Sequence, residues 1–182
     1  MARLSFYFFI LLCVFSGPSL SKDFQLTQDT NVKFKYFVAS LPFEGEFKVI
    51  ESKFDINFQN PSKSIFSVEF DLMQSNAGFL LATKAMKQVL DAYRFPIVMF
   101  ESTSVEFKDE KFHVVGFLKV RNVSKPVNLK VTVLENYSSD SEKVLFSIRA
   151  SFNRRQFGAD DYYPLVSDAI VIEDVLTINK SQ

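Results

Sequence analysis

Residues 95–158 carry the most information about the fold, because they contain, in order, FPIVMFES (95–102), GFLKVRNVSKPVNL (116–129) and NRRQFG (153–158). Within this stretch apolar and polar residues alternate with a period of two. Such alternation is typical of β-strands that have one dry and one solvated face. The stretch therefore predicts a series of half-buried strands.

The same alternation continues outside this stretch, in residues 32–38, 54–58, 66–72, 127–133 and 144–152. Turn-forming residues separate the runs, for example Asn60-Pro61-Ser62 and Ser138-Ser139-Asp140-Ser141. Because every strand has one dry face, the strands must cover these faces with one another. Many short strands joined by turns predict a β-sandwich or a closed β-barrel, in a single domain without repeats or linkers.

One segment departs from this pattern. Between Ala77 and Arg94 the apolar period changes from two toward 3.6, which predicts a helix over 80–93 that ends at Phe95-Pro96. Two interpretations of this helix remain open. It caps the core, or it is a lid that places Leu81, Met86 and Leu90 against a ligand and Lys84, Lys87 and Arg94 near the entrance.

The N-terminus has the features of an export signal. Arg3 precedes an apolar run from Leu4 to Phe15, and small residues follow near Ser21. We therefore expect residues 1–21 to be a cleaved signal peptide and residues 22–182 to be the mature domain. Cys13, the only cysteine, follows Leu12 rather than a small residue, so no lipid anchor is expected. The mature domain then folds without disulfides, which its length permits.

Charge and composition exclude some classes of function and favour others. The chain has 21 basic and 21 acidic residues, a balance that argues against a nucleic-acid-binding protein. His113 is the only histidine and follows the polar side of its strand, and Asp160-Asp161 has no second ligand cluster, so neither catalysis nor a metal or other cofactor is predicted. Of 22 phenylalanines only four lie in the signal, and the other 18 either fill a core or line an apolar cavity.

In their order and spacing the three motifs, together with FEGEF at 43–47, resemble the YceI-like family of lipid and polyisoprenoid carriers. The resemblance covers about residues 24–178. It implies an all-β fold, an eight-stranded antiparallel lipocalin-like barrel with one α-helix inserted between strands, and a bound apolar chain. It also points to bacterial export and thus to the periplasm. The sequence departs from the family pattern at Gln156, where an acid is usual, and near Val89-Leu90, where a phenylalanine is usual.

Strand phase, the helix stripe and this resemblance define a set of candidate ligand-binding residues: Phe34, Tyr36, Phe47, Phe54, Phe66, Phe70, Leu81, Met86, Leu90, Phe100, Leu118, Leu129, Val131, Phe146, Ile148 and Arg154. Arg154 aligns with the family arginine and has two interpretations. It binds carboxylates or backbone carbonyls and fixes the turn before Gly158, or it meets a polar or phosphorylated head group at the barrel rim.

The sequence thus predicts an exported, non-catalytic carrier of a polyisoprenoid, a quinone tail or a similar fatty-chain lipid, which contacts a membrane transiently. Two alternatives stay open: a packed barrel that serves as an interaction module with no cavity, and a lipid-modifying enzyme. An enzyme would need a convergent acid–base pair, and only isolated carboxylates such as Asp71 and Asp91 are present. The oligomeric state and the identity of the ligand stay undetermined.

Overall fold

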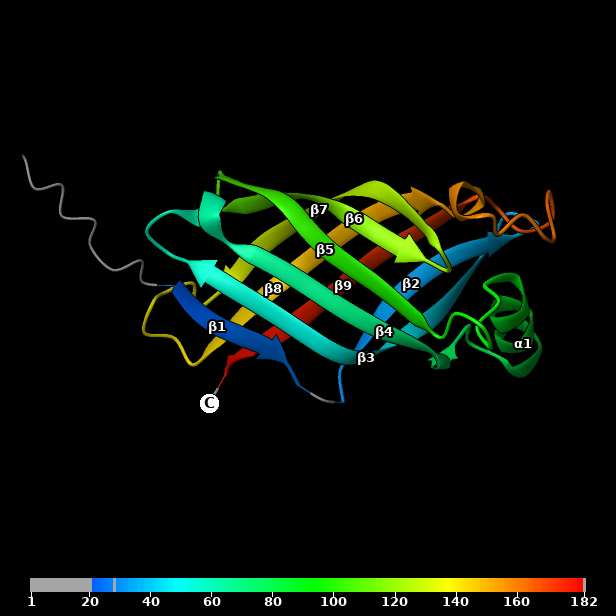
Figure 1. Cartoon of the computed structure of the whole chain (residues 1–182), viewed down its shortest axis with the longest axis horizontal. Helices are drawn as coiled ribbons and strands as arrows, with labels where there is room; N and C mark the ends of the chain where they lie inside the picture. Colours follow the sequence, from blue (N-terminus) through cyan, green and yellow to red (C-terminus); the bar gives the residue numbers. More distant parts are fainter. Residues whose placement is uncertain (1–20, 28, 182) are drawn as a thin grey trace, which may run out of the picture.

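The structure, a computed structural model, describes residues 21–27 and 29–181, so the predicted signal peptide lies outside the described residues except for Ser21. Nine strands, one α-helix and two 3₁₀-helices follow one another as β1 (Ser21–Leu26), β2 (Asn31–Val38), β3 (Leu41–Asn57), η1 (Pro61–Lys63), β4 (Ile65–Asn76), α1 (Leu80–Val89), β5 (Ile97–Lys108), β6 (Lys111–Val120), β7 (Val123–Glu135), β8 (Lys143–Asn153), η2 (Arg154–Phe157) and β9 (Ala169–Lys180). Figure 1 shows an elongated barrel with α1 at one end.

The nine strands form a closed barrel with eight strand positions. From β3 to β9 consecutive strands pair antiparallel, and β3 also pairs with β2. The short β1 and β2 share the remaining position, since each pairs with β3 on one side and with β9 on the other. Phe24 of β1 lies opposite Phe54, whereas Phe34 of β2 lies opposite Gly45 of the same long β3. The predicted eight-stranded antiparallel barrel with one inserted helix is confirmed.

Alternation places one set of side chains inside the barrel and the other on its wall. In β6, Phe112, Val114, Leu118 and Val120 are buried while Val115, Phe117 and Lys119 are exposed. Gly116 is in phase with the buried set. A Cβ on Gly116 would lie 2.6 Å from the ring of Phe100 on β5, so the missing side chain makes room for that ring.

Helix α1 is shorter than the sequence predicted. It ends at Val89 rather than near residue 93, because Asp91 adopts a left-handed conformation with φ of 49°. The amides of Asp91 and Ala92 then donate to the carbonyls of Gln88 and Lys87, at 3.0 and 2.8 Å. These bonds close the helix in the manner of a Schellman motif, one turn before Pro96. Pro96 instead starts the extended chain into β5, where its carbonyl accepts from Leu72.

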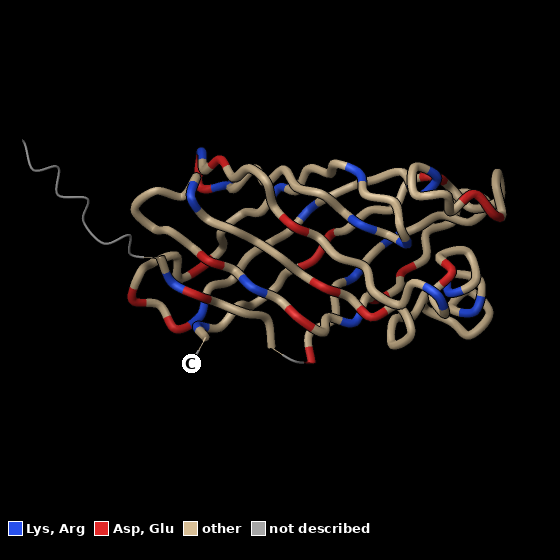
Figure 2. The backbone as a smooth tube through the Cα atoms, in the orientation of Figure 1, with Lys and Arg blue, Asp and Glu red and all other residues tan. Residues whose placement is uncertain are grey.

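Charged side chains of both signs lie along the outer wall. Figure 2 shows Lys and Arg interspersed with Asp and Glu on neighbouring strands. Glu173 of β9, for example, is within ion-pair distance of both Arg149 and Lys35. In the described part of the chain no helix has the length and apolar character needed to cross a bilayer.

Candidate functional site

The interior of the barrel contains an apolar cavity of about 670 Å³. All sixteen candidate residues line it: Phe34, Tyr36, Phe47, Phe54, Phe66, Phe70, Leu81, Met86, Leu90, Phe100, Leu118, Leu129, Val131, Phe146, Ile148 and Arg154. The strands supply most of them because the period-two phase points the same set inward along each strand. Their location agrees with the expectation, while their contact with a ligand stays a prediction.

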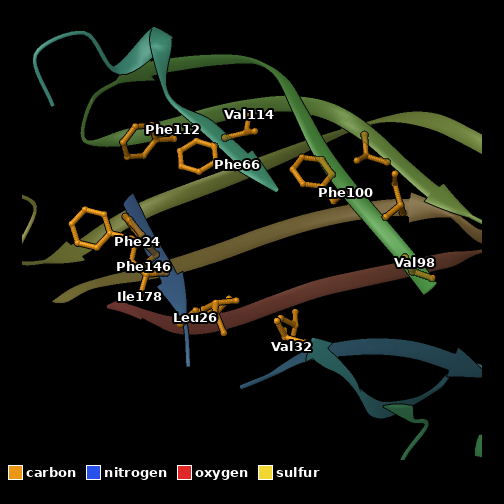
Figure 3. Packing of buried hydrophobic residues seen from close by; sticks show 14 of the residues in the cluster. Phe24, Leu26, Val32, Phe66, Val98, Phe100, Phe112, Val114, Phe146 and Ile178 are labelled. Carbon is orange, nitrogen blue, oxygen red and sulfur yellow. The ribbon is translucent and has the colours of Figure 1, made fainter. Parts of the chain in front are cut away.

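Aromatic rings seal the cavity at the end opposite α1. The ring of Tyr137, from the loop between β7 and β8, lies 4.9 Å from that of Phe58 and 5.3 Å from that of Phe107. Phe112 packs edge-on against Phe66 at 5.8 Å, and Figure 3 shows these two rings side by side inside the barrel. Burial raises the pKa of Tyr137 to about 12. This end of the barrel is therefore a packed hydrophobic core.

Rings farther along the barrel lie against the wall and leave the centre open. Phe34 stacks on Phe47 at 4.2 Å, and Phe47 in turn lies 5.7 Å from Phe70. The phenylalanines thus line a space instead of filling it. This geometry removes the premise of the packed-module interpretation, which needed interlocked rings and no cavity.

The cavity opens at the end that carries α1. Phe79, Leu81, Tyr162 and Leu165 line it and are also between 47 and 71% exposed, so the cavity reaches solvent there. Leu81, Met86 and Leu90 of the helix segment contribute to the lining, a position that both the cap and the lid interpretation allow. We call this opening the mouth.

Polar groups near the mouth fix the chain on either side of the opening. The buried hydroxyl of Tyr36 donates to the carbonyl of Ala77 at 2.8 Å, and burial raises the pKa of Tyr36. The amide of Ala77 donates in turn to Oγ1 of Thr83 in α1, at 3.0 Å. These bonds hold the start of the helix against β2.

Arg154 is buried, and its guanidinium holds the loop that follows η2. Its nitrogens donate to the carbonyls of Ala159, Asp161 (2.9 Å), Val166 (3.0 Å) and Ser167 (2.9 Å). Burial lowers the pKa of Arg154, while Asp168 and Asp160 act in the opposite direction. The geometry therefore agrees with the structural interpretation of this residue, in which backbone carbonyls are its partners.

Arg155, for which the sequence predicted no separate role, makes the ion pairs of this corner. Its guanidinium lies 3.1 Å from Asp160 and 3.5 Å from Asp168, and it stacks over the ring of Tyr163 at 4.5 Å. Hydrogen bonding to Asp160 raises the pKa of Arg155. Asp160 is thus engaged in an ion pair rather than in a ligand cluster.

The two helix lysines lie outside the cavity. Lys87 donates to the carbonyl of Met73 at 2.6 Å, and Lys84 is exposed. The remaining candidates for chemistry also lie apart from the cavity: Asp91 pairs with Arg94 at 3.3 Å, and Asp71 accepts from Gln74. Within residues 21–27 and 29–181, no group of three His, Cys, Asp or Glu side chains could hold a metal ion.

Sequence reasoning missed two groups of cavity residues. The first lies on strands and includes Val98, Phe112, Val114, Ile172 and Leu176. Their alternation phase was visible and could have identified them. The second group, Tyr162 and Leu165, lies in the loop after η2, which has no period that could predict the direction of a side chain.

The model of the YceI-like domain family matches residues 25–179 of the chain. Among curated proteins, the chain is 22% identical over 125 residues to Protein YceI of Salmonella newport and 24% identical over 132 residues to Protein YceI of Salmonella agona. These matches span 65 and 69%, respectively, of both this chain and the relative. The chain belongs to the YceI-like family.

Solved structures share the fold. BcnA of Burkholderia cenocepacia superposes with a TM-score of 0.71 at 19% identity, covering 81% of this chain and 94% of that chain. A YceI protein of Campylobacter jejuni gives a TM-score of 0.67 at 20% identity, with 76 and 85% covered. At these identities the likeness establishes the barrel, and the ligand has to be argued from the cavity of this chain.

Proposed function

We propose that this YceI-like protein is a non-catalytic binding protein that holds one apolar chain inside its barrel. The observation that carries the proposal is the cavity of about 670 Å³, which is lined almost entirely by apolar side chains and opens at one end. A polyisoprenoid, the tail of an isoprenoid quinone or a similar fatty-chain lipid has matching chemistry. Pockets of about 300–1,000 Å³ are typical of small-molecule sites.

Energetics favour exchange with a membrane over capture from water. Burying one methylene contributes about 0.8 kcal/mol, so a chain of about 40 carbons would gain roughly 30 kcal/mol against water. This figure exceeds the practical ceiling of about 18–21 kcal/mol for non-covalent affinity. A ligand that leaves an apolar bilayer for an apolar cavity changes its surroundings little. We therefore propose a carrier that contacts a membrane transiently, in the periplasm if the predicted export signal functions.

The polar groups that line the cavity support binding rather than catalysis. Arg154 is engaged with backbone carbonyls, and the hydroxyl of Tyr36 donates to Ala77. Among the described residues that line the cavity, Asp161 is the one carboxylate and none is a histidine, whereas an acid–base mechanism needs a second such group. We therefore propose binding without catalysis.

Solvent extraction of the purified protein followed by mass spectrometry tests the proposal. We expect a stoichiometric fatty-chain or isoprenoid lipid. Phe70→Trp adds a larger ring to the cavity wall and should lower the bound amount several-fold while the barrel stays folded. Phe117→Trp is the matched control, because Phe117 is 47% exposed on the outer wall. The absence of lipid before and after incubation with lipid extracts, or equal loading of both variants, would contradict the proposal.

A further inference from the structure

Large apolar side chains are exposed around the mouth of the cavity. We define an apolar rim by Leu41, Phe79, Leu80, Leu81, Tyr162 and Leu165, which are 47–71% exposed. The loops at the opposite end, residues 58–64, 109–110 and 136–142, contain no large apolar side chain that is exposed. Ile65 and Leu134, the nearest, lie on strands. Exposed large apolar side chains are thus more numerous at the mouth than at the opposite end, and a concentration of this kind is typical of an interaction surface.

The rim is one continuous surface although it comes from three segments. The rings of Phe43 and Phe79 lie 5.9 Å apart and connect the start of β3 to the start of α1. The amide of Ala39 donates to the carbonyl of Leu165 at 2.9 Å and connects the turn between β2 and β3 to the loop after η2. Phe79 and Leu81 also line the cavity, so the rim continues the cavity wall outward.

Charge next to the rim favours an anionic partner. Lys84 and Lys87 lie on α1, in a stretch from residue 77 to residue 90 that contains no Asp or Glu. Neither lysine forms an ion pair in the described part of the chain. Several acids of the neighbouring segments form ion pairs: Asp91 with Arg94, Asp160 and Asp168 with Arg155, and Glu44 with Lys35. Glu46 and Asp71 accept from the neutral side chains of Asn31 and Gln74, and Asp161 forms no ion pair with another described residue.

We propose that the apolar rim docks on the surface of a bilayer that contains anionic phospholipid, with the mouth facing the membrane. The proposal rests on the proposed function, since a bilayer is the source and destination of the ligand. With the mouth against the membrane, the apolar cavity would be continuous with the apolar interior of the bilayer, so the ligand would move between them without entering water. Leucine and aromatic side chains beside lysines are the usual composition of an interfacial contact.

The absence of tryptophan from the chain permits a site-specific test. Leu80→Trp places one indole on the rim, and Ile65→Trp places one at the opposite end, on a side chain 54% exposed. The full chain is mixed with phosphatidylcholine vesicles that contain phosphatidylglycerol. We expect a blue shift in the Leu80→Trp protein and quenching by brominated acyl chains, with neither change in Ile65→Trp. Responses that are absent, equal or stronger in Ile65→Trp would overturn the proposal. A concentration-dependent shift without vesicles would show a contact between copies and would also overturn it.

The charge component is tested separately. Removing one lysine near an anionic surface typically weakens binding about five-fold. We expect Lys84→Gln and Lys87→Gln each to reduce affinity for phosphatidylglycerol vesicles to this extent, and raised salt to do the same. Lys63→Gln, at the opposite end, is the control. An equal loss in Lys63→Gln would overturn the assignment of the anionic contact to α1.

Lipid extraction of the same proteins separates this proposal from the proposed function. If the Leu80→Trp protein carries lipid but its indole does not enter the bilayer, docking through the rim is wrong and the carrier function stands. If the indole enters the bilayer but no lipid is ever bound, the carrier function is wrong.

Discussion

At the closed end of the barrel the aromatic rings of Phe58, Phe107, Phe112 and Tyr137 pack within 4.6–5.6 Å of a neighbouring ring. At the mouth, Phe79 is 49% exposed and Leu81 is 71% exposed. Both ends use large apolar side chains, but only one end uses them as a core. The difference follows from the connections, since short turns bring strands and rings together, whereas two long insertions hold the mouth apart.

Hydrogen bonds hold the chain segments in place at the mouth, whereas ring packing holds them in place at the closed end. The insertion after η2 is held by the Arg154 guanidinium, and the insertion that carries α1 is held by Tyr36 through the carbonyl of Ala77. Polar anchors fix the backbone without filling the space between the two insertions. The barrel thus remains open at one end because that end is held by hydrogen bonds to the backbone.

The largest expected effect comes from truncating a ring in the closed end. Phe112 is completely buried, so Phe112→Ala should lower the free energy of unfolding by about 3–5 kcal/mol. Phe79→Ala, at the mouth, should lower it by less than about 1 kcal/mol. Urea unfolding followed by circular dichroism measures both. Similar losses would show that the mouth belongs to the same core and would remove the distinction between the two ends.

A second comparison sets Arg154 against its neighbour at the mouth. Arg154→Ala leaves four carbonyls without their donor and should lower stability by about 2–4 kcal/mol. Arg155→Ala removes exposed ion pairs and a stacking contact with the exposed ring of Tyr163, and it should change the melting temperature little. Because Arg154 acts through the loop, its loss should weaken binding of neutral and charged lipids alike.

Arg154→Lys discriminates between the two roles of this residue. Lysine keeps the positive charge but cannot reach carbonyls in several directions at once. If Arg154 holds the loop, Arg154→Lys should resemble Arg154→Ala in melting temperature and in lipid loading. Retained binding of anionic lipids in Arg154→Lys, with selective loss in Arg154→Ala and at high salt, would support the head-group role instead.

The barrel could be predicted from the sequence because the period-two alternation of apolar and polar residues corresponds directly to the two faces of each strand. The alternation within each strand shows that Phe34, Phe70 and Phe146 point inward. Every candidate residue that was predicted from this alternation lines the cavity. The same phase extends to Phe112 and Ile172, which a more complete application of the rule would have found.

The mouth could be predicted only in part because its anchors are backbone groups. Arg154 donates to carbonyls five to thirteen residues away. Because every residue has a backbone carbonyl, the residue types do not show which carbonyls are its partners. The end of α1 depends on the left-handed conformation of Asp91, a position where glycine is the usual indicator. Sequence patterns predict buried faces well and hydrogen bonds to the backbone poorly. The closed end, which depends on buried faces, could therefore be predicted better than the mouth, which depends on hydrogen bonds to the backbone.

The smallest effects, of opposite sign, are expected from removing one tyrosine hydroxyl at each end. The Tyr137 hydroxyl is buried and has no hydrogen-bond partner in the described part of the chain. Tyr137→Phe should therefore stabilise the protein by about 1 kcal/mol, because an unsatisfied polar group is removed. Tyr36→Phe removes the donor to Ala77 and should destabilise by about the same amount. Two losses of equal size would show that the closed end also depends on a polar anchor.

The dependence of the free energy of unfolding on pH above pH 10 provides an independent test of whether the Tyr137 hydroxyl is buried. Burial raises the pKa of Tyr137 from 10.0 to about 12, so the folded state keeps a proton that the unfolded state releases more readily. Ionisation of Tyr137 does not affect the free energy of unfolding below pH 10, and it lowers this free energy as the pH rises from 10 toward 12, because the unfolded state loses its proton first. In Tyr137→Phe the free energy of unfolding should therefore fall less steeply between these two pH values than in the original protein. An unchanged slope would place the Tyr137 hydroxyl in water, and the closed end would then be open to solvent.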